Sequence, residues 1–173
     1  MCAADEKPED RVFTVMCDGA GVDPLLNTVL STAAGFALQN LPGSIYDVEI
    51  LGVYVAGISG TYQVGHLALA AVNHSELVTG TPCRSVASRP KDDNSGCPVA
   101  FSGATLVRVP TYVAPVVGLQ AAGNFIVYSP NFVPIPPLTL PPGYVATLHA
   151  LAAGAATAPK AVLGFRYRLR PVR

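Results

Sequence analysis

Charge is almost absent from the second half of this chain, and that absence limits what the chain can fold into. No acidic residue follows Asp93, and between Thr105 and Pro159 the only charged side chain is Arg108. So long an uncharged stretch cannot lie entirely in water, yet proline and glycine divide it into short runs rich in Val, Ile, Leu, Tyr and Phe. Such runs are typical of β-strands, whereas a membrane helix needs about 20 uninterrupted apolar residues. The sequence therefore predicts an all-β fold.

The chain is expected to form one domain, residues 11–173, after a flexible charged arm at residues 1–10. Its length of 173 residues falls within the size of a single domain. The strand-like runs are residues 11–17, 45–55, 62–72, 99–109, 112–119, 124–128, 138–140, 144–151 and 161–172. At residues 24–34 we expect one short helix instead, because Asp23-Pro24 has the chemistry of a helix start and apolar residues follow at helical spacing.

Strands without long intervening helices do not build a parallel βαβ sheet, so the candidates are a sandwich, a closed barrel and a jelly roll. Long excursions between some strands favour Greek-key connections, and the polar residues 73–98 are the longest of these. We therefore predict a single jelly-roll β-barrel or sandwich of about eight strands.

The last strand has two different faces. Apolar Phe165, Tyr167 and Leu169 alternate with Arg166, Arg168 and Arg170. One face is expected to enter the core, while the other carries three guanidinium groups in a row. This stripe is a candidate contact for an acidic protein neighbour, anionic lipid head groups or nucleic acid, or it is a charged edge strand that discourages unwanted pairing. The zero net charge weighs against specific nucleic-acid binding.

Two further segments have a clear local pattern. In residues 45–55, apolar positions alternate with Asp47 and Glu49, so both carboxylates are expected to point to water. Residues 129–143 contain six prolines. Because proline lacks an N–H group and fixes φ, this stretch is expected to be extended, rigid and outside a central position in any sheet. It is predicted either to dock against another subunit or to cover the end of its own barrel.

No pattern of catalytic or metal-binding residues is found. His66, His74 and His149 stand apart, and no carboxylate in the second half can complete a cupin-type site. The histidines are therefore expected to be partnered or surface residues and not ligands. The sequence lacks a Gly-x-Ser-x-Gly elbow, a phosphate-binding loop and a dinucleotide fingerprint. We expect no enzyme activity, no cofactor and no metal.

The four cysteines are Cys2, Cys17, Cys83 and Cys97, without zinc-finger spacing. Cys83 and Cys97 bracket the polar residues 84–96, so a disulfide between them could pin the ends of that loop, or both could remain thiols in a reducing cytosol. Cys2 lies in the arm and could cross-link two subunits.

Composition indicates a protein that associates with others. Charged residues make up 13% of the chain against about 25% in an average soluble domain, which leaves apolar surface to be covered. Residues 1–93 hold every acidic residue and residues 94–173 are purely basic in charge, which suits head-to-tail contacts unless the two halves interleave in one barrel. The charged N-terminus has no signal-peptide core, so the product is expected to be made in a cytoplasm.

A charged arm, short strands, the proline-rich crossover LTLPPGYVATLHAL and the terminal strand FRYRLR together resemble viral jelly-roll coat proteins. The nearest likeness is to the small major capsid proteins of tailless icosahedral phages that have an internal membrane and infect thermophilic bacteria. The resemblance implies a virion shell of single β-barrels, in which the chain contacts copies of itself and a larger capsid protein above a lipid membrane. It implies no particular contact residues.

Two other functions fit a jelly roll. A trimeric receptor- or ligand-binding head, such as a phage spike or a tumour-necrosis-factor-like domain, would form a compact trimer that does not build shells. A carbohydrate-binding or cupin-like module would need a groove of exposed aromatic residues or a metal triad, but Trp is absent.

Overall fold

The computed structural model describes residues 12–61, 65–73, 78–83, 85–87, 98–119, 131–152 and 157–172. Over these residues the chain forms eleven strands and no helix. The strands are β1 (Val12–Met16), β2 (Ala33–Gln39), β3 (Tyr46–Thr61), β4 (Gly65–Asn73), β5 (Thr79–Cys83), β6 (Ser85–Ala87), β7 (Val99–Thr105), β8 (Thr111–Leu119), β9 (Asn131–Leu140), β10 (Tyr144–Ala152) and β11 (Thr157–Pro171).

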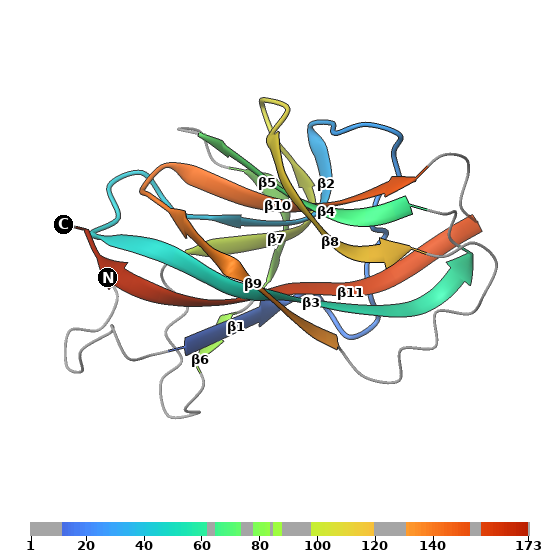
Figure 1. Ribbon diagram of the computed structural model, residues 1–173, viewed down its shortest axis with the longest axis horizontal. Coiled ribbons are helices and arrows are strands. Elements are labelled where there is room, and N and C mark those ends of the chain that lie inside the picture. Colours follow the sequence, from blue (N-terminus) through green and yellow to red (C-terminus); the bar gives the residue numbers. More distant parts are fainter. Residues whose placement is uncertain are drawn as a thin grey trace.

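The strands form two antiparallel sheets that pack face to face (Figure 1). The first sheet has the order β6-β1-β11-β3-β9 and the second has the order β5-β7-β2-β10-β4-β8. Eight strands pair as nested partners, because β1 pairs with β11, β2 with β10, β3 with β9 and β4 with β8. This nesting, with partners divided between two sheets, is the jelly-roll topology and confirms the predicted fold. The other three strands, β5, β6 and β7, follow β4 and widen both sheets.

The main core lies between the sheets, where apolar side chains of alternate strand positions meet. The ring centres of Phe36 in β2 and Phe165 in β11 are 5.7 Å apart, and Phe13 stacks on Tyr167 with ring centres 5.3 Å apart. Phe165, Tyr167 and Leu169 are all buried, as the alternation of the last strand predicted. Burying each such side chain contributes about 2 to 3 kcal/mol, so these strands anchor the sandwich.

The second sheet also has apolar residues packed on its outer face. A separate buried cluster joins Ala37 and Val145 of the sheet to Val78 and Leu106, which belong to the segments flanking β5 and β7. The backbone N–H of Val78 donates to Oε1 of buried Gln39 at 3.1 Å. The chain between β4 and β8 therefore covers part of this outer face.

The helix predicted at residues 24–34 is wrong. Asp23 Oδ1 accepts a hydrogen bond from the N–H of Leu25 at 2.8 Å, which makes a local turn, and Leu25 has a φ of 53°. Val22 and Asn27 form isolated bridges to Ala161 and Leu151, so this segment runs along the strands and β2 begins at Ala33. Asp before a turn and Asp before a helix use the same side-chain chemistry, and here the turn prevails.

Other strand predictions need smaller corrections. The polar stretch 73–98 contains β5 and β6 in its described part, and the strand predicted at 99–109 ends at Thr105. The short strand predicted at 138–140 is the end of β9, whereas the strand predicted at 124–128 lies outside the described residues, as does the arm. In the described part of the chain, no helix is long and apolar enough to cross a membrane.

Candidate subunit interface

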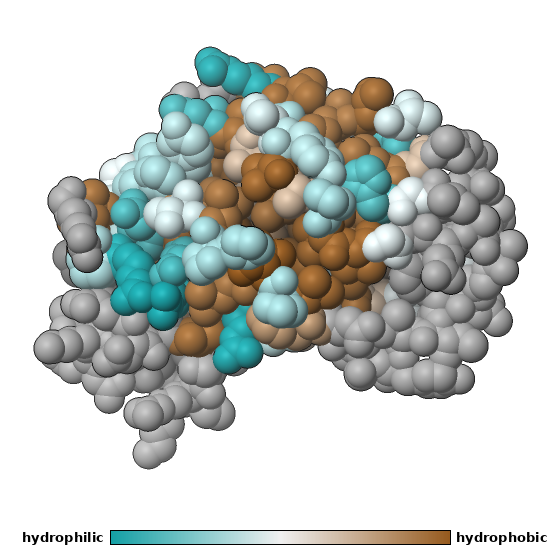
Figure 2. Space-filling view, in the orientation of Figure 1, coloured by the Kyte–Doolittle hydropathy of each residue, from teal (hydrophilic) through white to brown (hydrophobic). Residues whose placement is uncertain are grey.

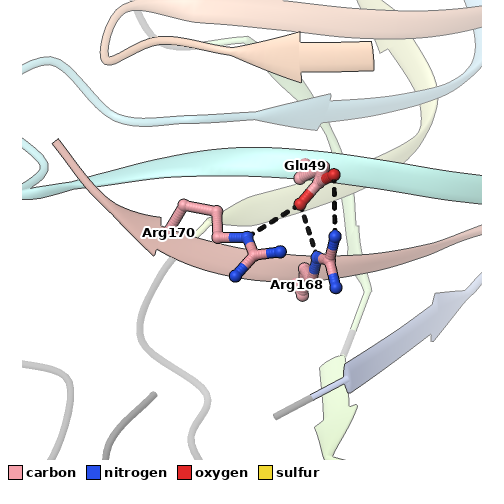
Figure 3. A network of polar contacts seen from close by, with 3 residues as sticks. All are labelled: Glu49, Arg168 and Arg170. Carbon is pink, nitrogen blue, oxygen red and sulfur yellow. Dashed lines mark hydrogen bonds and ion pairs between the residues drawn. The ribbon is translucent and has the colours of Figure 1, made fainter. Parts of the chain in front are cut away.

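Glu49 of β3 and two arginines of β11 form a polar network on the outer face of the first sheet (Figure 3). Arg168 stands directly opposite Glu49 in the β3–β11 register and binds its carboxylate through both Nε and Nη2, with Nη2 3.0 Å from Oε1. Arg170 Nε donates to Glu49 Oε2 at 2.9 Å. Two neighbouring positions on one face of β11 therefore share a single carboxylate.

The arginines determine the charge state of this carboxylate. Hydrogen bonding to Arg168, with a further contribution from Arg170, lowers the pKa of Glu49 from 4.5 to about 2. Glu49 lies on the outer face of the sheet, as the alternation predicted, but its side chain is only 14% exposed because it is bound to the two arginines. It is held ionised between two guanidinium groups, and Arg168 in turn has a raised pKa because of its hydrogen bond to Glu49. Charge-assisted contacts of this kind fix side-chain orientation as well as adding stability.

The third residue of the stripe, Arg166, lies over an aromatic ring. Its guanidinium carbon is 5.4 Å from the centre of the Phe132 ring, and Phe132 contacts Tyr54 with ring centres 5.2 Å apart. Gly52 makes room for this arrangement, because a Cβ atom there would collide with the Phe132 ring and lie 2.7 Å from the carbonyl oxygen of Val133. The cation–π contact secures Arg166 against β9.

These contacts decide between the interpretations of the arginine stripe. β11 lies between β1 and β3, so the interpretation as a protective edge strand is wrong. All three arginines have partners within the chain, yet the Arg168 and Arg170 side chains remain 32% and 43% exposed. Arg168 and Arg170 stand opposite Glu49 and Asp47 in the strand register, whereas Arg166 stands opposite Gly52. Contact with an acidic or anionic partner stays a prediction.

The acidic and basic halves of the chain interleave in the fold. Each nested pair of the jelly roll joins a strand before residue 74 to one after residue 110, and the Glu49 network links the two halves directly. Charges of opposite sign thus meet inside one chain, as the alternative interpretation held, and head-to-tail contacts remain a prediction.

One side of the sandwich is apolar. There the edge strands β8 and β9 approach each other across the gap between the sheets, and neither residues 111–119 nor residues 131–140 include a charged residue. We call this side the β8–β9 face. Its exposed side chains include Tyr112, Val113 and Phe132. Figure 2 shows apolar surface over the middle of the view and hydrophilic surface toward its left side.

The apolar surface continues from β8 into the loop before it. Val107 and Val109 are 57% and 56% exposed, and together with Tyr112 and Val113 they put four large apolar side chains in contact with solvent within seven residues, 107–113, in which Arg108 is the one charged residue and is also exposed. In Figure 1 this loop, between β7 and β8, rises from the top of the molecule. Exposed apolar patches on this scale are typical of surfaces that contact other proteins.

The edge strands resist pairing with further strands. β9 carries Pro134, Pro136 and Pro137, which confirms that the proline-rich stretch is extended and lies at a sheet edge. β8 contains Pro115 and two register shifts, β5 contains Pro82 and one shift, and β6 is three residues long. Prolines, bulges and short length all discourage edge-to-edge association. A partner would therefore meet this protein through side chains and not by adding strands to its sheets.

The described histidines do not form a metal site. His149 is buried on the outer face of the second sheet, with Nε2 2.9 Å from Thr147 Oγ1, and burial lowers its pKa to about 4. His66 meets the ring of Tyr112 edge-on, with ring centres 6.0 Å apart. Within the described ranges, no group of three or more His, Cys, Asp or Glu residues could hold a metal ion. His74 lies outside those ranges.

Only two of the four cysteines lie among the described residues. Cys17 is buried and Cys83 half-buried, and both are free thiols. Cys2 and Cys97 lie outside the described residues, so the proposed cross-link through Cys2 and the Cys83–Cys97 disulfide both stay predictions.

The Glu49 network and the exposed loop 107–113 are the features that sequence reasoning missed. The sequence does contain a signal for the network, namely an acidic residue in one alternating strand and a row of arginines in another. Whether they pair depends on which strands lie side by side, and the sequence does not reveal that order. Comparisons of the chain with protein-family models, with curated proteins and with solved structures found no match.

Proposed function

We propose that this chain is a structural subunit of a virion shell. In this proposal it associates with copies of itself and packs with a second, larger capsid protein to form an icosahedral layer over a membrane. The jelly roll is one of the folds from which viral shells are built, and it also serves lectins and cupins, so the fold alone does not carry the proposal.

The observation that carries it is the apolar surface formed by the β8–β9 face and residues 107–113. A chain with this surface gains free energy when the surface is covered, at about 25 cal/mol for each Å² of apolar area removed from water. Sheet edges that resist pairing direct the association toward defined side-chain contacts. Closed shells need such contacts, because open-ended strand addition would produce fibres instead.

The arginine network supports a role for the first sheet as a second contact surface. Its partly exposed guanidinium groups suit an acidic protein neighbour or the head groups of anionic lipids. Because Glu49 already orients Arg168 and Arg170, little side-chain freedom would be lost when a partner binds.

Sedimentation velocity and negative-stain electron microscopy of the purified full chain test the proposal. We expect concentration-dependent species much larger than a monomer. The double variant Val109→Asp/Tyr112→Asp places two carboxylates in the apolar surface and should shift the chain toward the monomer. The control variant Val29→Asp alters an exposed valine in the segment between β1 and β2, outside the apolar surface, and should leave assembly unchanged.

The sizes observed separate this function from its rivals. A single discrete trimer that never enlarges would favour a receptor-binding head. A lasting monomer that binds a sugar would favour a carbohydrate-binding module. Either result would refute the shell proposal.

A further inference from the structure

Cys17 and Cys83 lie where two neighbouring chain segments meet. β1 and β6 pair antiparallel up to Val15 opposite Ser85. Cys17 follows Val15 by two residues and Cys83 precedes Ser85 by two, so both cysteines lie beyond the same end of this ladder. A disulfide needs Cα atoms about 4.4 to 6.8 Å apart, so a bond between the two cysteines requires their segments to approach each other closely at this point.

Both side chains also belong to the same apolar surroundings. Cys17 is part of the main core cluster, and Cys83 packs against that cluster from the end of β5. Burial is the main cause of the raised pKa of each thiol, and for Cys17 the nearby Cys83 contributes to the rise. This contribution agrees with both cysteines lying beyond the same end of the β1–β6 ladder.

We propose that Cys17 and Cys83 form an intramolecular disulfide when the protein is exposed to oxidising conditions. The bond would join Cys17, just after β1 of the first sheet, to Cys83, the last residue of β5 in the second. It competes with a Cys83–Cys97 disulfide for the same sulfur. The inference does not depend on the proposed shell function, because it concerns the stability of a single chain.

A small-molecule disulfide such as oxidised glutathione can serve as the oxidant. The Cys83 thiolate, on the half-buried side chain, attacks one sulfur of the reagent to form a mixed disulfide and releases one thiolate. The Cys17 thiolate then attacks the Cys83 sulfur and releases the second. The protein loses two protons and two electrons, and the reagent takes them up and leaves as two thiols, so the exchange balances.

The double variant Cys2→Ser/Cys97→Ser tests the pair directly, because it leaves Cys17 and Cys83 as the only cysteines. After treatment with oxidised glutathione at about pH 8.5, where more thiolate is present, we expect an intact mass lower by two hydrogen atoms. Proteolysis without reducing agent should release one linked peptide pair that contains both cysteines.

Thermal unfolding supplies a second measurement. The bond closes a loop of about 65 residues, and the chain-entropy model together with the usual scaling of Tm predicts a rise of about 10 °C that a reducing agent reverses. Cys83→Ser in the same background should show no mass loss and no rise. A double variant that gives only glutathione adducts or linked dimers would overturn the proposal, as would a wild-type chain in which Cys83 is bonded to Cys97.

Discussion

Replacement of Glu49 by glutamine should destabilise the fold in a way that depends on pH. The substitution keeps the shape of the side chain but removes the charge that holds Arg168 and Arg170. In the wild-type protein the pKa of Glu49 is lowered from 4.5 to about 2, a difference of about 2.5 units, which corresponds to at most about 3 kcal/mol. Because the two arginine side chains are 32% and 43% exposed, water screens the interaction, and we expect a loss of about 1 to 2 kcal/mol.

The pH window follows from the direction of the shift. A carboxylate with a lowered pKa in the folded state stabilises the fold fully above pH 4.5, and that stability is lost as pH falls from 4.5 to about 2. Wild-type protein and Glu49→Gln should therefore differ most near neutral pH and converge near pH 2. Salt at about 1 M should reduce the difference, because the Debye length falls to about 3 Å.

Urea unfolding at a series of pH values, with and without salt, measures these differences. Asp47→Asn is the matched control, because Asp47 lies opposite Arg170 in the same strand pair but is not the carboxylate that both arginines bind. If Glu49→Gln costs no more than Asp47→Asn near pH 7, or if its cost is the same at pH 7 and pH 2, the carboxylate does not stabilise the fold through the two arginines.

Three further substitutions test other parts of the fold. Gly52→Val should lower the free energy of unfolding by about 1 to 3 kcal/mol, because its Cβ would collide with Phe132. Gly118→Ala, which has open space around the new atom, should lower it much less. Equal losses in thermal or urea unfolding would contradict the packing. Leu148→Ala should cost about 2 to 5 kcal/mol because it leaves a cavity in the main core, and a loss below about 1 kcal/mol would mean that this site is not packed as described. Burial lowers the pKa of His149 from 6.5 to about 4, so as pH falls the unfolded chain binds a proton at this histidine before the folded chain does. The free energy of unfolding should therefore fall by up to about 3 kcal/mol between pH 6.5 and 4. His149→Gln should flatten this pH dependence, and an unchanged slope would mean that other groups cause it.

The strands with strict alternation were predictable from the sequence. The apolar residues of β11 and those at the start of β3 face the core, because side chains alternate across a strand whatever its neighbours are. Proline chemistry likewise placed β9 outside the centre of a sheet, since Pro134, Pro136 and Pro137 have no N–H group to donate. Both predictions depend only on local chemistry.

Features that depend on strand order were not predictable. Glu49 looked like a water-facing residue because the sequence does not reveal that β11 lies beside β3. The helix predicted at residues 24–34 failed for a related reason, since the bridges of Val22 and Asn27 to distant strands outweigh the local spacing of leucines. The packing of Val78 and Leu106 on Ala37 and Val145 was likewise not predictable, because it joins residues that are far apart in the sequence.

The central claim is that other subunits cover the apolar surface formed by the β8–β9 face and residues 107–113. Hydrogen–deuterium exchange, measured on dilute and on associated protein, tests it at the level of individual segments. We expect amides in residues 106–119 to exchange more slowly in the associated protein, while those in residues 17–32 are unchanged. Equal exchange of residues 106–119 in both samples, or a chain that stays monomeric at every concentration, would contradict it.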